Sequence, residues 1–306
     1  MKVEKRMLSV ILTMVLVFMS ACSSGADTGS SEPRAAVILK GLTTSYWFSV
    51  NAGAEQAAED LDFDIDILAP TTADSNEQQL NLLEEAINNA YDVICISPAD
   101  SSGIISGIEL ANEAGIPIVN YATQVAGDVE IAARMRIEDF DASYAVSKAL
   151  CEMLGEGEVI ILEGITGQQN AIDKTNGAIK AIEEFPDIEL VACQPANWLR
   201  SDAYTVTQNL LQANPDIKGI IAANDDMALG AVQAVEEAGL SENIMISGMN
   251  CAVFAIEALK NGQIDVTIDV MAYELGYDAV ETAWKIATGQ EYEADVVIEA
   301  ELCTIE

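Results

Sequence analysis

Short apolar runs alternate with amphipathic segments of helical length along the chain from Ala35 onward. Such runs are typical of buried strands, and the segments between them are long enough for crossover helices. A crossover of this length makes the two strands that it joins parallel, with a right-handed connection. The pattern therefore predicts an α/β fold, with strands at residues 36–39, 63–68, 93–96, 116–119, 159–162, 190–192, 219–223 and 243–247.

The segments between these runs form two series. Helices are expected at residues 46–61, 172–185, 204–211, 251–259 and 273–286, and extended chain at residues 262–269. The first βαβ series ends near Tyr121 and the second begins near Asp139, and 306 residues are enough for two lobes of ordinary size. Two α/β lobes in one chain imply a cleft between them.

Three aspartates, Asp62, Asp64 and Asp66, alternate with apolar residues in the second predicted strand. Closely spaced carboxylates could indicate calcium. Alternation with a period of two, however, places them on one solvated face of a strand. We therefore expect an edge strand at this position.

Asn224, Asp225 and Asp226 directly follow the apolar run at residues 219–223, and a helical pattern resumes behind them. In open α/β sheets, ligands bind outside the carboxyl ends of the strands, which is where Asn224 would stand. We predict that Asn224 contacts a ligand. Asp225 and Asp226 are expected to cap and solvate the following helix.

The composition excludes several classes of function. Lys and Arg total 14 against 50 Asp and Glu, which gives a net charge of -36, and such a field disfavours nucleic acid as a partner. The chain has no histidine, so it lacks the usual general base and the commonest metal ligand. No glycine-rich nucleotide-binding pattern opens a helix. We expect neither a cofactor nor a metal.

Five cysteines follow Cys22, and they are scattered over the apolar runs without a Cys-x-x-Cys pair. An odd number in this arrangement argues against a disulfide framework and against a zinc or redox site. Buried free thiols are the prediction for Cys95, Cys151, Cys193, Cys251 and Cys303.

The N-terminus has the form of a signal peptide, with a basic leader before an apolar run from Met7 to Met19. The run ends in Met19-Ser20-Ala21-Cys22, which resembles the lipobox of bacterial lipoproteins, where the cysteine is acylated. We expect a signal peptide at residues 1–21, lipidation of Cys22, and a flexible tether at residues 22–34. A plain secretory peptide cut nearby is the alternative.

Several motifs resemble the type I periplasmic binding proteins of the ribose/galactose class, the substrate-binding lipoproteins of ABC sugar transporters. These motifs are residues 96–100 (ISPAD), 114–118 (AGIPI), 194–198 (QPANW), 224–231 (NDDMALGA) and 246–250 (ISGMN). The resemblance implies two Rossmann-like lobes with parallel sheets, joined by a three-segment hinge. The first lobe would hold residues 35–136 plus 271–299, and the second residues 137–270 plus 300–306. Ligand would bind between the lobes, which close on it without catalysis.

By this resemblance, aromatic rings would enclose a sugar ring and polar groups would bind its hydroxyls. Tyr46 and Trp47 occupy the family's aromatic positions after the first strand, and Trp198 occupies the opposing one. The remaining candidate ligand contacts are polar residues at or near family site positions, together with the tyrosine that ends the fourth strand: Thr44, Tyr121, Thr123, Asn170, Lys174, Asn224, Asn250 and Asp269.

The chain also departs from the family pattern. Ala122 and Thr123 replace a common Asp-Arg pair, and Val270 replaces a polar hinge residue. Asn250 stands where an aspartate is usual, and Lys174 lacks the fork of an arginine. We therefore expect a pocket that is less charged and more aromatic than a ribose or galactose site. Arg134 and Arg136 could compensate for the missing polar groups. For Arg136, however, a salt bridge with Glu138 is the preferred interpretation.

The resulting hypothesis is a monomeric, lipid-anchored solute-binding protein on the outer face of a bacterial membrane. It would capture a neutral, sugar-like cyclic molecule and deliver it to an ABC permease. A binding protein that serves a membrane receptor, or an importer component for a nucleoside, remains open. The signal peptide and the lack of a basic headpiece argue against a repressor core. An enzyme is supported only by carboxylates such as Asp225 and Asp269.

Overall fold

The computed structural model describes residues 32–303. The predicted signal peptide, Cys22 and residues 23–31 of the tether lie outside the described residues. Within the described part of the chain, no helix combines the length and apolar character that crossing a bilayer requires.

The first lobe is built on a six-stranded sheet in the order β11-β5-β4-β3-β1-β2, and all of its pairings are parallel. Its strands are β1 (Arg34–Ile38), β2 (Asp64–Leu68), β3 (Val93–Ile96), β4 (Ile118–Tyr121), β5 (Ala133–Ile137) and β11 (Asp295–Ile298). β2 forms an edge of the sheet and exposes Asp64 and Asp66, which confirms the edge-strand prediction.

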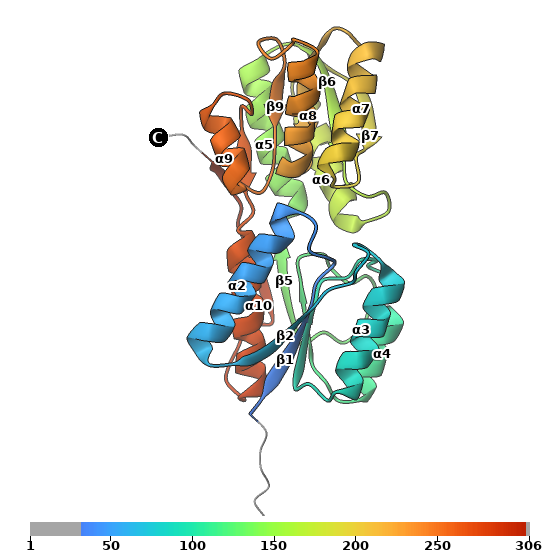
Figure 1. Ribbon diagram of the computed structural model, residues 1–306, viewed down its shortest axis with the longest axis vertical. Helices are drawn as coiled ribbons and strands as arrows, with labels where there is room; N and C mark the ends of the chain where they lie inside the picture. The colour runs from blue at the N-terminus through green and yellow to red at the C-terminus, as the bar shows by residue number, and fades with distance from the viewer. Residues whose placement is uncertain (1–31, 304–306) are drawn as a thin grey trace, which may run out of the picture. The chain divides into compact units, whose positions relative to one another are not determined.

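Alternate residues of these strands face two separate hydrophobic cores, as the period of a buried strand requires. Val37 and its neighbours pack against α2 (Ser45–Leu61) and α10 (Ala272–Ala287), whereas Ile38 faces α3 (Asn76–Asn88) and α4 (Ile105–Glu113). Figure 1 shows α2 and α10 side by side on one face of the sheet and α3 with α4 on the other. α10 therefore belongs to the first lobe although it comes late in the chain.

The second lobe is built on a four-stranded parallel sheet in the order β7-β6-β8-β9. Its strands are β6 (Gly157–Glu163), β7 (Ile188–Pro195), β8 (Ile217–Ala222) and β9 (Met245–Ser247). One face packs on α5 (Asp139–Leu154) and α6 (Gln169–Ile182). The other packs on α7 (Arg200–Ala213), α8 (Asp225–Glu237) and α9 (Val253–Lys260).

A short antiparallel pair, β10 (Thr267–Asp269) with β12 (Glu301–Cys303), lies apart from the parallel sheets that the sequence predicts. The chain passes three times between the elements of the two lobes: from β5 to α5, from β10 to α10, and from β11 to β12. Of the stretch expected to be extended at residues 262–269, only β10 forms a regular strand.

The pairing of β12 with β10 also corrects the prediction for two cysteines. Cys251 and Cys303 form a disulfide, with their Cα atoms 6.5 Å apart, although they are separated by 52 positions in sequence. The free-thiol prediction is wrong for this pair, because only the fold brings the loop after β9 to the C-terminal strand. Cys95 and Cys151 are buried free thiols, as predicted, and Cys193 is a free thiol that is only partly buried.

Candidate functional site

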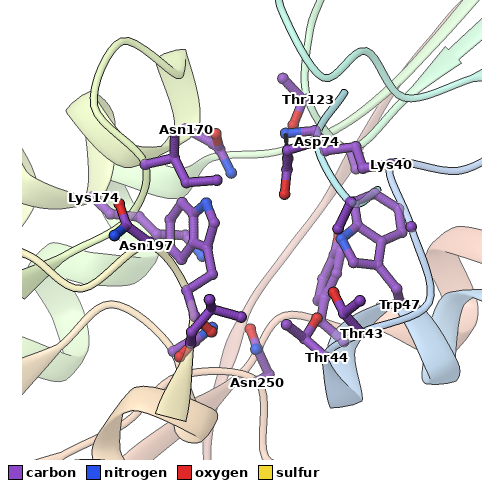
Figure 2. Close-up of a pocket in the computed structure, with 18 of the residues that line it drawn as sticks. Lys40, Thr43, Thr44, Trp47, Asp74, Thr123, Asn170, Lys174, Asn197 and Asn250 are labelled. Atoms are coloured by element: carbon purple, nitrogen blue, oxygen red, sulfur yellow. Dashed lines mark hydrogen bonds and ion pairs between the residues drawn. The ribbon is translucent and has the colours of Figure 1, made fainter. Parts of the chain in front are cut away.

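A cavity of about 330 Å³ lies at the carboxyl ends of strands from both lobes. Most of its lining lies at or after the ends of β1, β2, β4 and β5 of the first lobe and of β6, β7, β8 and β9 of the second, so loops at the ends of parallel strands form both walls. Nine of the eleven predicted ligand contacts line it: Thr44, Tyr46, Trp47, Thr123, Asn170, Lys174, Trp198, Asn224 and Asn250. Figure 2 shows Trp47 and Thr123 on one side of the cavity and Asn170 and Lys174 on the other.

The wall from the first lobe is dominated by an aromatic cluster at the start of α2. The rings of Tyr46 and Trp47 pack edge to face, with their centroids 5.0 Å apart. The rings of Trp47 and Tyr121 have the same arrangement, with their centroids 6.5 Å apart. Trp47 is 9% exposed and belongs to the lobe's hydrophobic core. Burial raises the pKa of the Tyr46 hydroxyl, which therefore stays neutral at physiological pH.

Tyr121 does not line the cavity. Its side chain is fully buried behind Trp47, and its hydroxyl donates to the backbone oxygen of Ile38 at 3.0 Å. The predicted ligand contact is therefore a core residue that supports the aromatic wall from behind.

The wall from the second lobe presents Trp198 from a left-handed backbone, with φ +65° at Trp198 and +53° at Asn197. The indole lies against Gly164, where any Cβ would collide with the ring, so the close approach requires glycine. The indole Nε1 donates to Oε1 of Gln168 at 2.8 Å. The Lys174 ammonium lies 5.3 Å from the ring centroid, within the range of a cation–π contact.

Asn224, and not one of the aspartates, is the N-cap of α8, which corrects the prediction. Its Oδ1 accepts from the backbone nitrogen of Met227 at 2.8 Å. Its Nδ2 donates to the backbone oxygen of Trp198 at 3.1 Å. The amide thus joins the helix cap to the aromatic loop while also lining the cavity.

The prediction of solvated carboxylates is also wrong for Asp225, which is fully buried. Its Oδ1 accepts from the Thr267 hydroxyl at 2.8 Å, and its Oδ2 accepts from the backbone nitrogen of Ala252 at 2.8 Å. Burial raises the pKa of this carboxyl to about 6. Asp226 points to the first lobe, where it accepts from the Ser45 hydroxyl at 2.8 Å and the Ser45 backbone nitrogen at 3.2 Å.

Asn170 and Asn250 offer unused acceptors to the cavity. The side-chain oxygen of each is buried and has no hydrogen-bond partner among residues 32–303. Asn250 is held at φ +119° while its backbone nitrogen donates to Ile268 at 2.8 Å. A buried acceptor without a donor is costly, so both amides are suited to accept from hydroxyls of a bound molecule.

Four charged residues line the cavity, and only Lys174 among them was predicted from the sequence. Lys40 and Asp74 from the first lobe, and Asp139 and Lys174 from the second, all line it. Lys174 Nζ lies 3.5 Å from an Asp139 oxygen, and Lys40 Nζ lies 4.0 Å from an Asp74 oxygen. Two ammonium groups thus face two carboxylates, and this balance suits a ligand without net charge.

Burial shifts the titration of these charged groups. It lowers the pKa of Lys40 to about 8, against the opposing effect of Asp74. It raises the pKa of Asp139, which the Lys174 ammonium partly offsets. Lys40 directly follows the apolar run of β1, at the end of the strand where ligands bind. This position in the sequence could have identified Lys40 as a residue of the site. Asp74 and Asp139 carried no comparable signal.

Asp269 is the second predicted contact that does not line the cavity. Its Oδ1 accepts from the backbone nitrogen of Met271 at 2.8 Å, while its neighbour Val270 lines the cavity instead. Arg136 forms one ion pair with Glu138 and a second with Asp295. The pair with Glu138 was predicted from the sequence.

Comparison with known proteins gives consistent results. Residues 35–291 match a family described as "Periplasmic binding protein domain". The D-allose-binding periplasmic protein of Escherichia coli (strain K12) is 32% identical over 252 residues, which cover 79% of this chain and 80% of the relative. A solved ABC transporter solute-binding protein of Actinobacillus succinogenes with bound D-allose is 37% identical, with a TM-score of 0.85 over 89% of this chain and 97% of the other. One from Bacillus halodurans with bound myo-inositol is 28% identical, with a TM-score of 0.84 over 90% of this chain and 95% of the other.

Proposed function

Because the chain belongs to the periplasmic binding protein family, we propose that it captures a sugar or sugar derivative in the cavity and delivers it to an ABC importer. The family consists of solute-binding proteins and not of enzymes. The observation that carries the proposal is the pair of aromatic walls, Tyr46 with Trp47 opposite Trp198, around unused amide acceptors.

The chemistry of the cavity supports a small polyhydroxylated ring. Aromatic faces pack against the C–H groups of a sugar and exclude water, while side chains at the rim bind its hydroxyls. The volume of about 330 Å³ lies at the low end for ligand pockets, which fits a ligand of one ring. The balanced lysines and aspartates favour a neutral sugar over a sugar acid or phosphate.

Capture would proceed by closure of the lobes about the three connecting segments. We propose lobe boundaries at residues 35–136 plus 271–299 and 137–270 plus 300–306. Hydrogen bonds from Ser45 to Asp226 and from Gln168 to Asp74 join the two lobes at the cavity, which supports a closed form held by direct contacts. The closed form would be the one that the permease receives.

Lipid anchoring through Cys22, after removal of residues 1–21, remains part of the proposal, as does a monomeric state. Metabolic labelling with palmitate should mark the wild type and leave Cys22→Ala unlabelled. Size-exclusion chromatography with light scattering of the mature chain should give the mass of one copy.

Ligand screening tests the central claim. Isothermal calorimetry and thermal shift should be run with D-allose, D-ribose, myo-inositol, a nucleoside and a set of amino acids. A rise in Tm with at least one sugar or polyol is expected, since a ligand that binds only the folded state stabilises it. A response to amino acids alone would overturn the assignment of the ligand class, and a response to the nucleoside alone would move it to that alternative.

A further inference from the structure

Gln168 lies directly behind Trp198, outside the lining of the cavity, at the N-terminus of α6. Its side chain is 6% exposed and does not cap the helix. Instead, its amide makes three hydrogen bonds, one to an aromatic ring of its own lobe and two to the first lobe. A buried amide whose two ends contact different lobes is placed to link them.

The donors and acceptors around Gln168 permit only one orientation of its amide. The indole Nε1 of Trp198 can only donate, so the oxygen of Gln168 must face it, and the distance is 2.8 Å. The amide nitrogen then points at the first lobe, where it donates to Asp74 Oδ1 at 2.8 Å and to the backbone oxygen of Ala99 at 3.4 Å. Both partners in the first lobe are acceptors, so each donor in this chain of hydrogen bonds faces an acceptor.

Asp74 extends the chain of bonds to the opposite wall of the cavity. It lines the cavity, and its carboxylate lies 4.0 Å from the ammonium of Lys40. Its backbone nitrogen donates to the backbone oxygen of Lys40 at 2.9 Å, at φ +57°. Figure 2 shows Lys40 and Asp74 together on the side of the cavity that faces Asn170 and Lys174. The bonds thus run from the Trp198 ring, through Gln168, to Asp74 beside Lys40.

We infer that Gln168 is a positioning residue that couples the orientation of the Trp198 ring to the closure of the two lobes. A ligand that packs on the indole holds its N–H in place, which holds the Gln168 amide with its nitrogen toward Asp74. Hydrogen bonds in such a chain polarise and strengthen one another away from water. The ring contact in the second lobe would therefore favour the bond to the first lobe. This inference rests on the proposed function only in that Trp198 is the ring that contacts the ligand.

The contact between Ser45 and Asp226 provides an internal comparison. It also joins the lobes, through two hydrogen bonds to one carboxylate oxygen, but no aromatic residue between positions 32 and 303 donates to that carboxylate. Its strength should be independent of the Trp198 ring. Only the Gln168 contact is expected to depend on what the ring does.

The two ends of the amide can be tested separately. Gln168→Glu keeps an oxygen for Trp198 but replaces the donor to Asp74 with a second carboxylate. Combining it with Asp74→Asn reverses the donor and acceptor and restores the bond. Gln169→Glu is the matched control, because Gln169 is exposed and donates to Asp173 within the same helix at 2.8 Å. Each variant should be measured by small-angle X-ray scattering without ligand and with D-allose, and by calorimetry with D-allose.

We expect Gln168→Glu to raise the radius of gyration and to weaken D-allose binding by about tenfold or more, since a buried bond is lost and two carboxylates meet. Without ligand, the double variant should return toward the wild-type radius of gyration, and Gln169→Glu should match the wild type in both measurements. If the double variant is no better than Gln168→Glu, or if Gln168→Glu matches its control, the lobe-joining role is overturned.

A cycle with Trp198→Phe tests the coupling itself, because phenylalanine keeps a ring but lacks the N–H. In that background, Gln168→Glu should weaken D-allose binding by less than in the wild type, because only the repulsion between the two carboxylates remains. An undiminished tenfold effect would overturn the coupling and leave a plain contact between lobes. If D-allose binds neither the wild type nor any variant, the proposed ligand is wrong. Scattering of the ligand-free proteins in the same cycle then still tests whether Gln168 joins the lobes and whether this depends on the Trp198 N–H.

Discussion

The two walls of the cavity are built in different ways. Tyr46 and Trp47 of the first lobe stand in the first turn of a regular helix, and Trp47 is packed into the hydrophobic core. Trp198 and Asn250 of the second lobe stand on backbone with positive φ, in loops held by hydrogen bonds and a disulfide. Hydrophobic burial thus fixes the first wall and contacts between distant polar groups fix the second, so the two should respond differently to substitution.

Removal of the disulfide should have the largest effect, and it concerns the second wall. Cys251→Ser with Cys303→Ser frees the residue next to Asn250 from β12. For a loop of 52 positions, chain entropy alone predicts a loss of about 4 kcal/mol in the free energy of unfolding. Affinity for D-allose should also fall, because Asn250 loses its support. Urea denaturation and calorimetry would measure the two effects.

The control for the disulfide variant is Cys193→Ser, which removes a free thiol. It should leave the affinity for D-allose unchanged. If the doubly substituted protein keeps both wild-type stability and wild-type affinity, the second wall does not depend on this brace, and the contrast between the walls fails.

Trp47→Ala tests the first wall and should cost about 3 kcal/mol in the free energy of unfolding without ligand, since a large buried side chain is deleted from a core. Affinity for D-allose should fall as well, because the same ring lines the cavity. Trp284→Ala is the matched control: Trp284 packs against the same core but does not line the cavity. It should reduce stability and spare affinity. A Trp47 variant that loses affinity at full stability would contradict a wall held by the core.

The contrast between the walls also explains how far the sequence could be interpreted. Most strands and helices followed from local periodicity, which places Tyr46 and Trp47 at the start of a helix after a buried strand. Their role as a wall of the cavity, in contrast, came from the family resemblance. The roles of Asp225 and Asp226 could not be predicted, since their partners, Thr267 and Ser45, lie far away in the chain. The same holds for the disulfide and for the Gln168 contact to Asp74.

The charged residues of the cavity show the same limit. Asn250 and Trp198 came from a family resemblance, which carries positions but not the bonds that they make. Asp74 and Asp139 oppose the two lysines only because the fold brings four loops together. A pattern in one segment contains no information about such pairs, so the sequence did not predict these two ion pairs.

Asp225 makes the support of the second wall dependent on pH between pH 4 and pH 7, a range in which Tyr46 of the first wall stays neutral. Its pKa of about 6, above the ordinary 3.8, means that the folded state holds the proton more tightly than the unfolded state. Its contribution to stability is therefore fully present below pH 4 and is lost as the pH rises through 6. Asp225→Asn cannot titrate, so its free energy of unfolding relative to the wild type should rise by about 2 to 3 kcal/mol between pH 4 and pH 7. Urea denaturation of both proteins between pH 4 and pH 7 measures how this difference in the free energy of unfolding changes with pH. A difference that does not change with pH would contradict a carboxyl pKa raised by burial.

Trp198→Ala should give the smallest effect on stability and separate the walls most clearly. The ring is only partly buried and rests on a loop, so its loss should lower the free energy of unfolding by no more than about 1 kcal/mol. Affinity for D-allose should nevertheless fall by roughly 1 to 2 kcal/mol, because aromatic anchors carry much of the binding energy in closed sites. Calorimetry and urea denaturation should be run on Trp198→Ala and Trp47→Ala together. Both variants should lose affinity for D-allose, but only Trp47→Ala should also lose much of its free energy of unfolding. An unchanged affinity would show that Trp198 does not face the ligand. A loss of stability as large as that of Trp47→Ala would show that the second wall, too, is held by burial.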